Sequence, residues 1–354
     1  MHATLLEPSE TFDLPPEWAP QSGVMLTWPH EGTIWADMLD DIDAVFTNVA
    51  KQIALREKVI ITCFDKRHEQ HIVSLLEKNG VYLHNVATFL APCDDVWVRD
   101  HGPLTVFKQG KPVLLDFTFN GWGSKYPAEQ DNEITRALHT QLAFANTAIM
   151  SLDIVLEGGA IETDGKGTLL TTSSCLLAKT RNPNLSKADI AEKLRQLLGM
   201  QRVLWLEHGH LAGDDTDGHI DTLARFTDAH TICYITCSDP ADEHYADLKA
   251  MEKELQQFKD YEGNPYKLVP LPWPTAQYAK YDGRRLPVTY ANFLIINGAV
   301  LVPTYNDPAD AEALRIIAQC FPQHEIVAID CAPAVQWYGS LHCMTMQLPE
   351  GVLA

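Results

Sequence analysis

Short runs of β-branched and aromatic residues alternate along this chain with amphipathic segments, and that alternation constrains the fold more than any other feature. The runs at 59–64, 114–119, 231–237 and 292–303 predict strands, because each ends at turn residues. Apolar residues spaced three or four apart predict helices over 42–53, 190–198 and 245–258. The second of these helices has a cap at Ser186 and a stop at Gly199. Mixed strands and helices favour the α/β class.

The same pattern indicates one domain over residues 1–354, since no low-complexity linker interrupts it. Residues 161–172 predict a hairpin closed by Asp164 and Gly165. Its Gly-Lys pair lacks the phosphate-loop spacing, and no G-x-G-x-x-G follows a strand, which argues against a nucleotide cofactor. No repeat is close enough to establish internal symmetry.

The charge of the chain narrows the range of partners. A net charge of −20 argues against nucleic acid as a partner and favours a small cation, although acidity also serves solubility alone. No apolar run reaches the ~18 residues of a membrane helix. The acidic, proline-containing N-terminus does not resemble a signal peptide, so we expect a cytoplasmic protein with reduced cysteines. A homo-oligomer is compatible with the sequence.

Two acidic segments are candidates for holding such a cation. In "CDDVWVRDHGP", Asp100 is free to bind a cation while Trp97 offers a flat aromatic face; the alternative is an ordinary ion pair beside a core tryptophan. In "LEGGAIE", Glu157 ends an apolar run before two glycines that allow close approach of a ligand. A glutamate at a strand end is also common without any function.

A third segment, "LEHGHLAGDDTDGHIDTLARF", crowds histidines and aspartates together. His219 and Asp221 would face the same side of an extended strand, a pairing typical of proton transfer near neutral pH. Just upstream, Asp214 and Asp215 are placed in a loop. A metal-dependent hydrolase is the alternative; its ligands would be His219 and the two histidines of the H-x-H pair, His208 and His210, but that pair lacks a complete ligand spacing.

The fourth segment is "YGSLHCMTMQLP" near the C-terminus. Among the eight cysteines, Cys343 has the least core-like neighbours, and a cysteine paired with a distant histidine is a known nucleophile arrangement. His342 would point to the opposite face, which leaves His219 as the candidate partner. An inert, half-buried thiol is the alternative.

Five segments of the chain together resemble one family. "VWVRDHGP", "LEGG", "DDTDGHID", "DGRRLPVTYANFLIINGAVLVPTYND" and "GSLHCMTMQLP" occur in the order and at roughly the distances seen in the agmatine deiminase family. This family is related to bacterial peptidyl-arginine deiminases and belongs to the guanidino-group-modifying, or pentein, superfamily. The resemblance runs from Met25 to Pro349 and implies a five-bladed, pseudo-symmetric α/β propeller with a central active site.

The resemblance also implies roles and a reaction. Cys343 would be the nucleophile and His219 the acid/base, while Asp100 and Asp221 grip a small cationic guanidine. Glu157 would position the histidine or the substrate. The reaction would hydrolyse agmatine to N-carbamoylputrescine and ammonia through a thiouronium intermediate, as in polyamine biosynthesis, with no metal and no cofactor.

The substrate-binding wall and the exact substrate are less constrained. By the same resemblance Trp97 would line the pocket, and Asp214 or Asp215 would meet a second cation. Where the family commonly has a glycine-rich run, this chain has bulky Trp337 and Tyr338, which could reshape the pocket entrance. Free or peptidyl arginine is the alternative substrate. The sequence also leaves open an amidinotransferase or a polyamine-binding protein.

Overall fold

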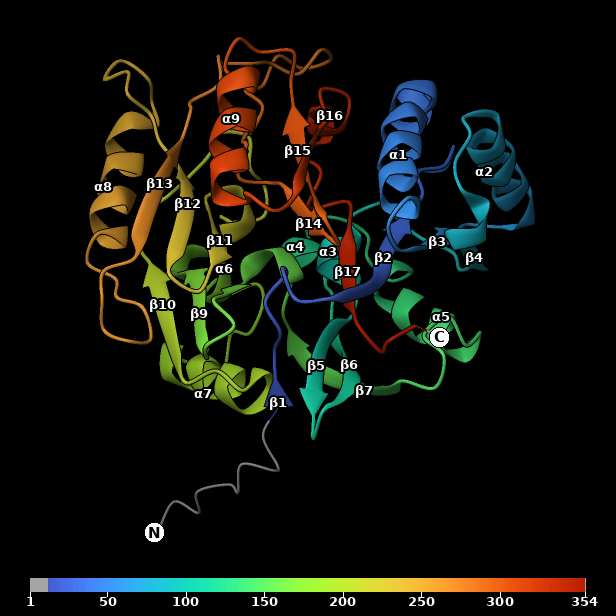
Figure 1. The fold of residues 1–354 in the computed structure, drawn as a ribbon, viewed down its shortest axis with the longest axis horizontal. Helices are drawn as coiled ribbons and strands as arrows, with labels where there is room; N and C mark the ends of the chain where they lie inside the picture. Colours follow the sequence, from blue (N-terminus) through green and yellow to red (C-terminus); the bar gives the residue numbers. More distant parts are fainter. Residues whose placement is uncertain (1–11, 354) are drawn as a thin grey trace.

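The computed structural model describes residues 12–353, and most of the N-terminal segment on which the expectation about export rests lies outside the described residues. The long helices occupy the periphery of the view in Figure 1, and the short helices α3 (Val98–His101), α4 (Gly121–Ser124) and α6 (Ser173–Leu176) lie nearer its centre. The helices are α1 (Leu39–Ala54), α2 (Lys66–Lys78), α3 (Val98–His101), α4 (Gly121–Ser124), α5 (Ile134–Thr140), α6 (Ser173–Leu176), α7 (Lys187–Leu198), α8 (Tyr245–Leu255) and α9 (Asp310–Cys320). None of these helices is long and apolar enough to cross a membrane.

The strands of the described chain form five sheets. The strands are β1 (Phe12–Asp13), β2 (Gln21–Thr27), β3 (Lys58–Cys63), β4 (Val86–Leu90), β5 (Leu104–Lys108), β6 (Lys111–Thr118), β7 (Ala148–Val155), β8 (Glu162–Thr163), β9 (Thr168–Thr172), β10 (Arg202–Leu206), β11 (Ala224–Asp228), β12 (Thr231–Ile235), β13 (Lys267–Leu271), β14 (Leu294–Ile296), β15 (Ala299–Thr304), β16 (Glu325–Asp330) and β17 (Met346–Pro349). Short 3-10 helices, η2 to η7, connect some of them; η5 (Gly158–Ala160) and η6 (Ile220–Thr222) matter below.

One strand pattern recurs in the five sheets of residues 12–353. A central strand pairs antiparallel with one neighbour and parallel with another, and helical segments connect the parallel pair, as in β12–α8–β13 and β15–α9–β16. The same pattern appears in β5–β6–β7 and β8–β9–β10. This repeat matches the five units that the family resemblance implied, although the repeated units share too little sequence to reveal it.

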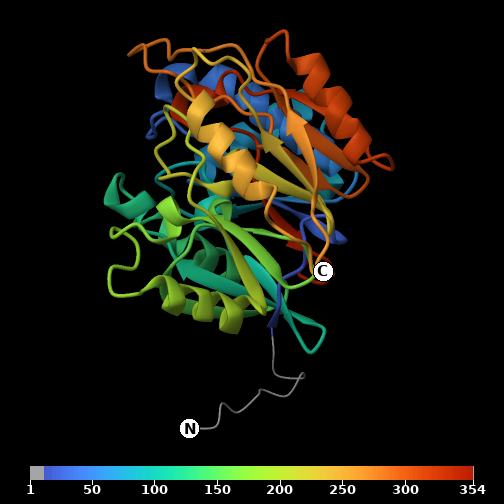
Figure 2. The ribbon, with the colours of Figure 1, turned by 90° about the vertical axis from the view of Figure 1, so that its left-hand side faces the viewer.

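The fifth sheet joins the two ends of the described chain. Its central strand β2 pairs parallel with β3 and antiparallel with β17, so the C-terminal strand completes the N-terminal sheet. Figure 1 shows β17 beside β2. In the turned view of Figure 2, α7, α8 and α9 (yellow-green, gold and orange-red) again lie on the outer surface. The centre of the molecule is therefore formed by the segments that connect one sheet to the next, and not by the long helices.

Local sequence signals explain the helices and most strands. The helix α7 begins at a reciprocal capping box between Ser186 and Asp189 and ends at Gly199 in the left-handed conformation, as predicted. The hairpin at residues 161–172 is present as β8 and β9. Two expectations were wrong. The run 292–303 is a hairpin, β14 and β15, because Asn297 and Gly298 form a turn. The segment at His219 and Asp221 is the 3-10 turn η6 and not a strand.

Candidate active site

Each of the five connections between sheets carries a polar residue to the middle of the molecule. The connections run from β4 to β5, β7 to β8, β10 to β11, β13 to β14 and β16 to β17. Each connection leads directly into the strand that pairs antiparallel with the central strand of the next sheet. This pairing fixes the direction in which the connection enters that sheet. In chain order they carry Asp100, Glu157, Asp221, Asn292 and Cys343, all of them buried.

The thiol of Cys343 faces two oxygen atoms. Its Sγ lies 3.8 Å from Asp221 Oδ2 and 3.4 Å from Asn292 Oδ1. Asn292 Oδ1 also accepts from the backbone N–H groups of His342 and Cys343, at 2.9 and 3.3 Å, which orients the amide oxygen toward the sulfur. Since both oxygens are acceptors, this arrangement suits a protonated thiol in the free protein.

Asp100, Asp221 and His219 surround the place where a side chain on residue 159 would lie, and that residue is glycine. Asp100 Oδ1 accepts from the N–H of Gly159 at 3.0 Å and lies 3.6 Å from His219 Nδ1. A Cβ at Gly159 would lie 2.5 Å from His219 Nδ1, 2.9 Å from Asp100 Oδ1 and 3.2 Å from Asp221 Oδ2. Only glycine fits there, because every larger residue would displace one of these groups.

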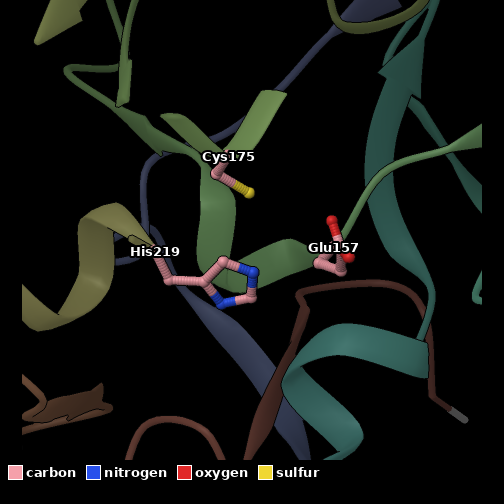
Figure 3. A group of neighbouring side chains, drawn as sticks. All are labelled: Glu157, Cys175 and His219. Carbon is pink, nitrogen blue, oxygen red and sulfur yellow. The ribbon is translucent and has the colours of Figure 1, made fainter. Parts of the chain in front are cut away.

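His219 is fully buried beside Glu157 and Cys175 (Figure 3). Glu157 precedes η5 and Cys175 lies on α6, so the three side chains come from separate segments. Arg181 holds Glu157 from behind: its Nε donates to Glu157 Oε1 at 3.0 Å, and its other nitrogens donate to Asp217 and to the carbonyl of Thr216. Arg181 thereby ties the loop before His219 to Glu157.

Behind Asp221 runs a chain of buried charges. His342 Nδ1 lies 2.8 Å from Asp221 Oδ2, and its Nε2 lies 2.8 Å from Glu17 Oε2. Glu17 also accepts from Arg225, which in turn pairs with Glu162. Residues 342 and 343 lie in a turn and not in an extended segment, and Cys343 Sγ lies 3.8 Å from Asp221 Oδ2, the same oxygen that His342 contacts. His342 therefore contacts the Asp221 carboxylate and helps to hold it in position.

Burial and neighbouring charges shift the pKa values of these groups. Burial, with Asp221 and Asp100, raises the pKa of Cys343 well above its usual value. Burial raises the pKa of Asp100 to about 6, although His219 opposes this. Burial also raises the pKa of Asp221, but the hydrogen bond from His342 and the nearby cations outweigh it and lower the net value. Burial lowers the pKa of His219, but Asp100 and Cys175 together raise it by more than burial lowers it, so the net pKa is well above its usual value. These shifts favour a neutral thiol beside a protonated imidazole.

A pocket of about 170 Å³ opens onto Cys343 and Asp100. Aromatic side chains and carboxylates both line it; the lining includes Trp97, Trp122, Tyr126, Tyr281, Trp337, Tyr338, Asp95, Asp214 and Asp215. Among the described residues that line it, none is Lys or Arg. The pocket thus suits a cationic ligand with an apolar middle.

Strained backbone gathers at this pocket. Trp122 has a left-handed φ of 53°, and its Nε1 donates to Asp100 Oδ2 at 2.9 Å. Tyr338 also has a left-handed φ, of 78°, in the position where the family resemblance leads one to expect glycine. Such conformations cost roughly 1–3 kcal/mol each in a non-glycine residue. The adjacent Gly339 is held against Trp97, since a Cβ would lie 2.3 Å from that ring.

The structure thus brings together most of the residues singled out from the sequence. Cys343, His219, Asp100, Asp221 and Glu157 form one cluster, and Trp97, Asp214 and Asp215 line the pocket in front of it. His208 instead pairs with Glu254, and within residues 12–353 neither it nor His210 joins a group of three potential metal ligands. The metal-hydrolase alternative therefore lacks its ligand set.

Several residues of the site escaped the sequence analysis. Asn292 lies inside one of the five family motifs, and its position before a strand was the available signal. Trp122, Cys175, Arg181 and Glu17 stand alone in the sequence, with no neighbouring motif to mark them.

Comparison with known proteins agrees with this geometry. A sequence profile for the Porphyromonas-type peptidyl-arginine deiminases matches residues 13–349. A solved structure from Porphyromonas gingivalis, described provisionally as an arginine deiminase, is 51% identical, with 96% of this chain and 99% of that chain covered and a TM-score of 0.91. The C. jejuni agmatine deiminase, solved as a cysteine-to-serine variant with substrate bound, is 35% identical, with 99% and 100% covered and a TM-score of 0.90.

The curated agmatine deiminase of Stutzerimonas stutzeri is 34% identical over 360 residues, which cover 96% of this chain and 95% of that protein. These matches extend over nearly the whole chain and include the segments that form the site. The protein described here therefore belongs to the Porphyromonas-type peptidyl-arginine deiminase family.

Proposed function

We propose that this protein is an agmatine deiminase, which hydrolyses the guanidinium group of agmatine to N-carbamoylputrescine and ammonia. One observation carries the proposal: the buried thiol of Cys343 and the carboxylate of Asp100 line a pocket that suits a cation, and the Asp221 carboxylate and His219 imidazole lie beside them. The agmatine deiminases of C. jejuni and Stutzerimonas stutzeri are related to this chain over nearly its full length.

Asp100 and Asp221 would hold the guanidinium. A guanidinium keeps its charge at neutral pH and presents a planar fork of N–H donors that matches carboxylates. Asp221 Oδ1 is buried and has no hydrogen-bond partner within the described chain, so it is available to such a donor. Two carboxylates at different edges would fix the plane and expose the central carbon to Cys343.

The reaction then follows from proton and charge balance. The Cys343 thiolate adds to the guanidinium carbon, and the protonated His219 gives its proton to the departing nitrogen, which leaves as ammonia. The product of this half is a cationic S-alkylthiouronium on Cys343. Neutral His219 next takes a proton from water, the hydroxide adds to the same carbon, and the C–S bond breaks to return the thiolate. Loss of the remaining hydroxyl proton gives the ureido product.

We propose that substrate binding causes Cys343 to lose its proton and become a thiolate. The carboxylates that hold the guanidinium also raise the pKa of Cys343, and a bound cation offsets that effect. Alkylation of Cys343 measured against pH, with and without an unreactive guanidine, tests this step. The apparent thiol pKa should fall when the guanidine is present; equal values in the two conditions would contradict it.

The acidic part of the pocket wall favours a second cation over a carboxylate. Asp215 lies there, its Oδ2 accepting from Tyr126 OH at 2.7 Å, and Asp214 lines the same wall. Agmatine ends in a primary amine, whereas free arginine would bring a carboxylate to this acidic surface. We further propose a cytoplasmic location, which the eight unpaired cysteines of the chain support.

Ammonia release from agmatine, free arginine and a peptide ending in arginine tests the choice of substrate. We expect the highest kcat/KM for agmatine, and a higher value for either arginine substrate would overturn it. Ammonia release without an added amine also separates hydrolysis from transfer to an acceptor amine.

A further inference from the structure

We propose that Glu157, Cys175 and His219 form a binding site for a thiophilic divalent cation such as Zn²⁺, and that occupation of this site switches the enzyme off. The site lies beside the reaction centre and does not include the nucleophile. Inhibition, though not metal binding itself, rests on the proposed role of His219.

The three donor atoms already lie close together. One carboxylate oxygen of Glu157, the Cys175 sulfur and one imidazole nitrogen of His219 all lie within 4.8 Å of one another. Figure 3 shows the three side chains converging from separate segments. Tetrahedral zinc, with bonds of about 2.0–2.3 Å, needs such donors roughly 3.3–3.7 Å apart. Side-chain adjustments of about 1 Å would close the difference.

Unused polar atoms point to a ligand at this place. Glu157 Oε2 and both nitrogens of His219 are buried and have no nitrogen or oxygen hydrogen-bond partner within the described chain; His219 Nδ1 lies 3.6 Å from Asp100 Oδ1, and the imidazole also interacts with the Cys175 thiol. Buried polar atoms are rarely left unpaired, because each costs about 1–3 kcal/mol. Cys175 is likewise fully buried, forms no disulfide, and is not used by the reaction proposed above. A cation would satisfy one atom of each residue.

The donor chemistry is that of zinc and not of calcium or magnesium. A thiolate, an imidazole and a single carboxylate oxygen favour zinc and similar metals, whereas hard cations require several oxygen ligands. When the metal binds, the Cys175 thiol and the protonated His219 imidazole each lose one proton to solvent, and the S–H and N–H bonds are replaced by bonds to the metal. The thiolate and the carboxylate together balance the two positive charges.

Arg181 orients the Glu157 carboxylate as a metal ligand. It binds Oε1, which leaves Oε2 without a hydrogen-bond partner in the described chain. Its own charge is shared with Asp217, so the cation meets a guanidinium that is already paired. Groups that orient a ligand in this way typically change metal affinity 10–100-fold when removed.

Cys343 belongs to a different set of contacts. Its sulfur faces Asp221 and Asn292 and is not part of this group of donors. A metal held at Cys175 would therefore leave the nucleophile intact. It would occupy the imidazole lone pair, so His219 could neither donate nor accept a proton.

Binding of Co²⁺ to the inactive Cys343→Ala protein tests the site apart from catalysis. Co²⁺ replaces Zn²⁺ and gives a thiolate-to-metal absorption band when sulfur is a ligand. We expect this band in Cys343→Ala and its loss in Cys343→Ala/Cys175→Ser. A matched control, Cys343→Ala/Cys320→Ser, removes a distant cysteine and should keep the band. Absence of the band from Cys343→Ala, or its survival in the Cys175→Ser protein, would overturn the site.

A second measurement guards against loss of folding in the serine variant. Cys343→Ala/Glu157→Gln keeps the sulfur and the shape of the side chain but removes the carboxylate charge. We expect it to bind Co²⁺ about 10–100-fold more weakly with the band retained, and unchanged affinity would contradict the proposed ligand set. In the otherwise unmodified enzyme, Zn²⁺ should inhibit ammonia release, and Cys175→Ser should raise the inhibition constant at least about tenfold. If Co²⁺ binds as expected while the enzyme lacks deiminase activity, the proposed function fails and the metal site stands.

Discussion

Gly159→Ala is the most direct perturbation of the geometry described here. The added Cβ would lie 2.5 Å from His219 Nδ1, whereas an ordinary carbon–nitrogen contact needs about 3.5 Å. The imidazole must therefore move by about 1 Å, or the neighbouring Asp100 and Asp221 must separate. Misplacement of a catalytic group by that distance costs on the order of 100-fold in rate. Converted at 1.36 kcal/mol per decade, this is about 2.7 kcal/mol of lost transition-state stabilisation.

Two measurements on this variant are needed: kcat from ammonia release with agmatine, and the free energy of unfolding from urea denaturation. We expect kcat to fall about 100-fold, with about 1–3 kcal/mol of stability lost to overpacking. Gly80→Ala is the control: its Cβ would meet nothing within 4 Å, so only its left-handed φ of 67° is strained. That variant should lose about 1 kcal/mol of stability and keep its kcat. A Gly159→Ala enzyme with undiminished kcat would refute the reasoning.

Four further outcomes follow from the same contacts. Asp221→Asn should lower the pKa of Cys343 in alkylation experiments while reducing kcat/KM at least about 100-fold, because the carboxylate that raises this pKa is also the one proposed to bind the substrate. As pH falls through about 6, kcat/KM should decline as Asp100 takes up its proton in the free enzyme, while the contribution of this group to folding stability rises down to its unfolded pKa near ~4; a pH profile that is flat from 7 to 5 would count against it. Asp215→Asn should raise KM for agmatine and leave KM unchanged for an alkylguanidine without the amine; equal effects on both would exclude contact with the amine. Arg181→Met should cost about 3–5 kcal/mol in unfolding measurements, because it leaves buried Glu157 unpaired; a loss below about 1 kcal/mol would show that the pair is not structurally important.

Local patterns sufficed for most of the fold. Alternation of strands and helices predicted the α/β class, and the Ser186 cap and Gly199 stop placed α7 to the residue. The five-part repeat of strand patterns was not visible, because it lies in hydrogen-bond pairing and not in side-chain identity. The error at 292–303 has a simple cause: Asn297 and Gly298 break an apolar run whose continuity suggested a single strand.

The candidate site was predictable where chemistry concentrates in short motifs. Asp100, His219 and Cys343 each stand in such a segment, and the family resemblance linked segments that local reasoning could not. Residues that contact the site only through another side chain were not predictable. Glu17 contacts His342 although 325 positions separate them, and the pairing of β17 with β2 brings them together.

Trapping the covalent intermediate tests the central claim most directly. The enzyme is mixed with agmatine, quenched in acid during turnover and digested, and the peptide that carries Cys343 is weighed. A mass increase equal to agmatine less ammonia, on that peptide and on no other cysteine peptide, is the predicted result. Turnover without any adduct on Cys343, or full activity in Cys343→Ala, would contradict it.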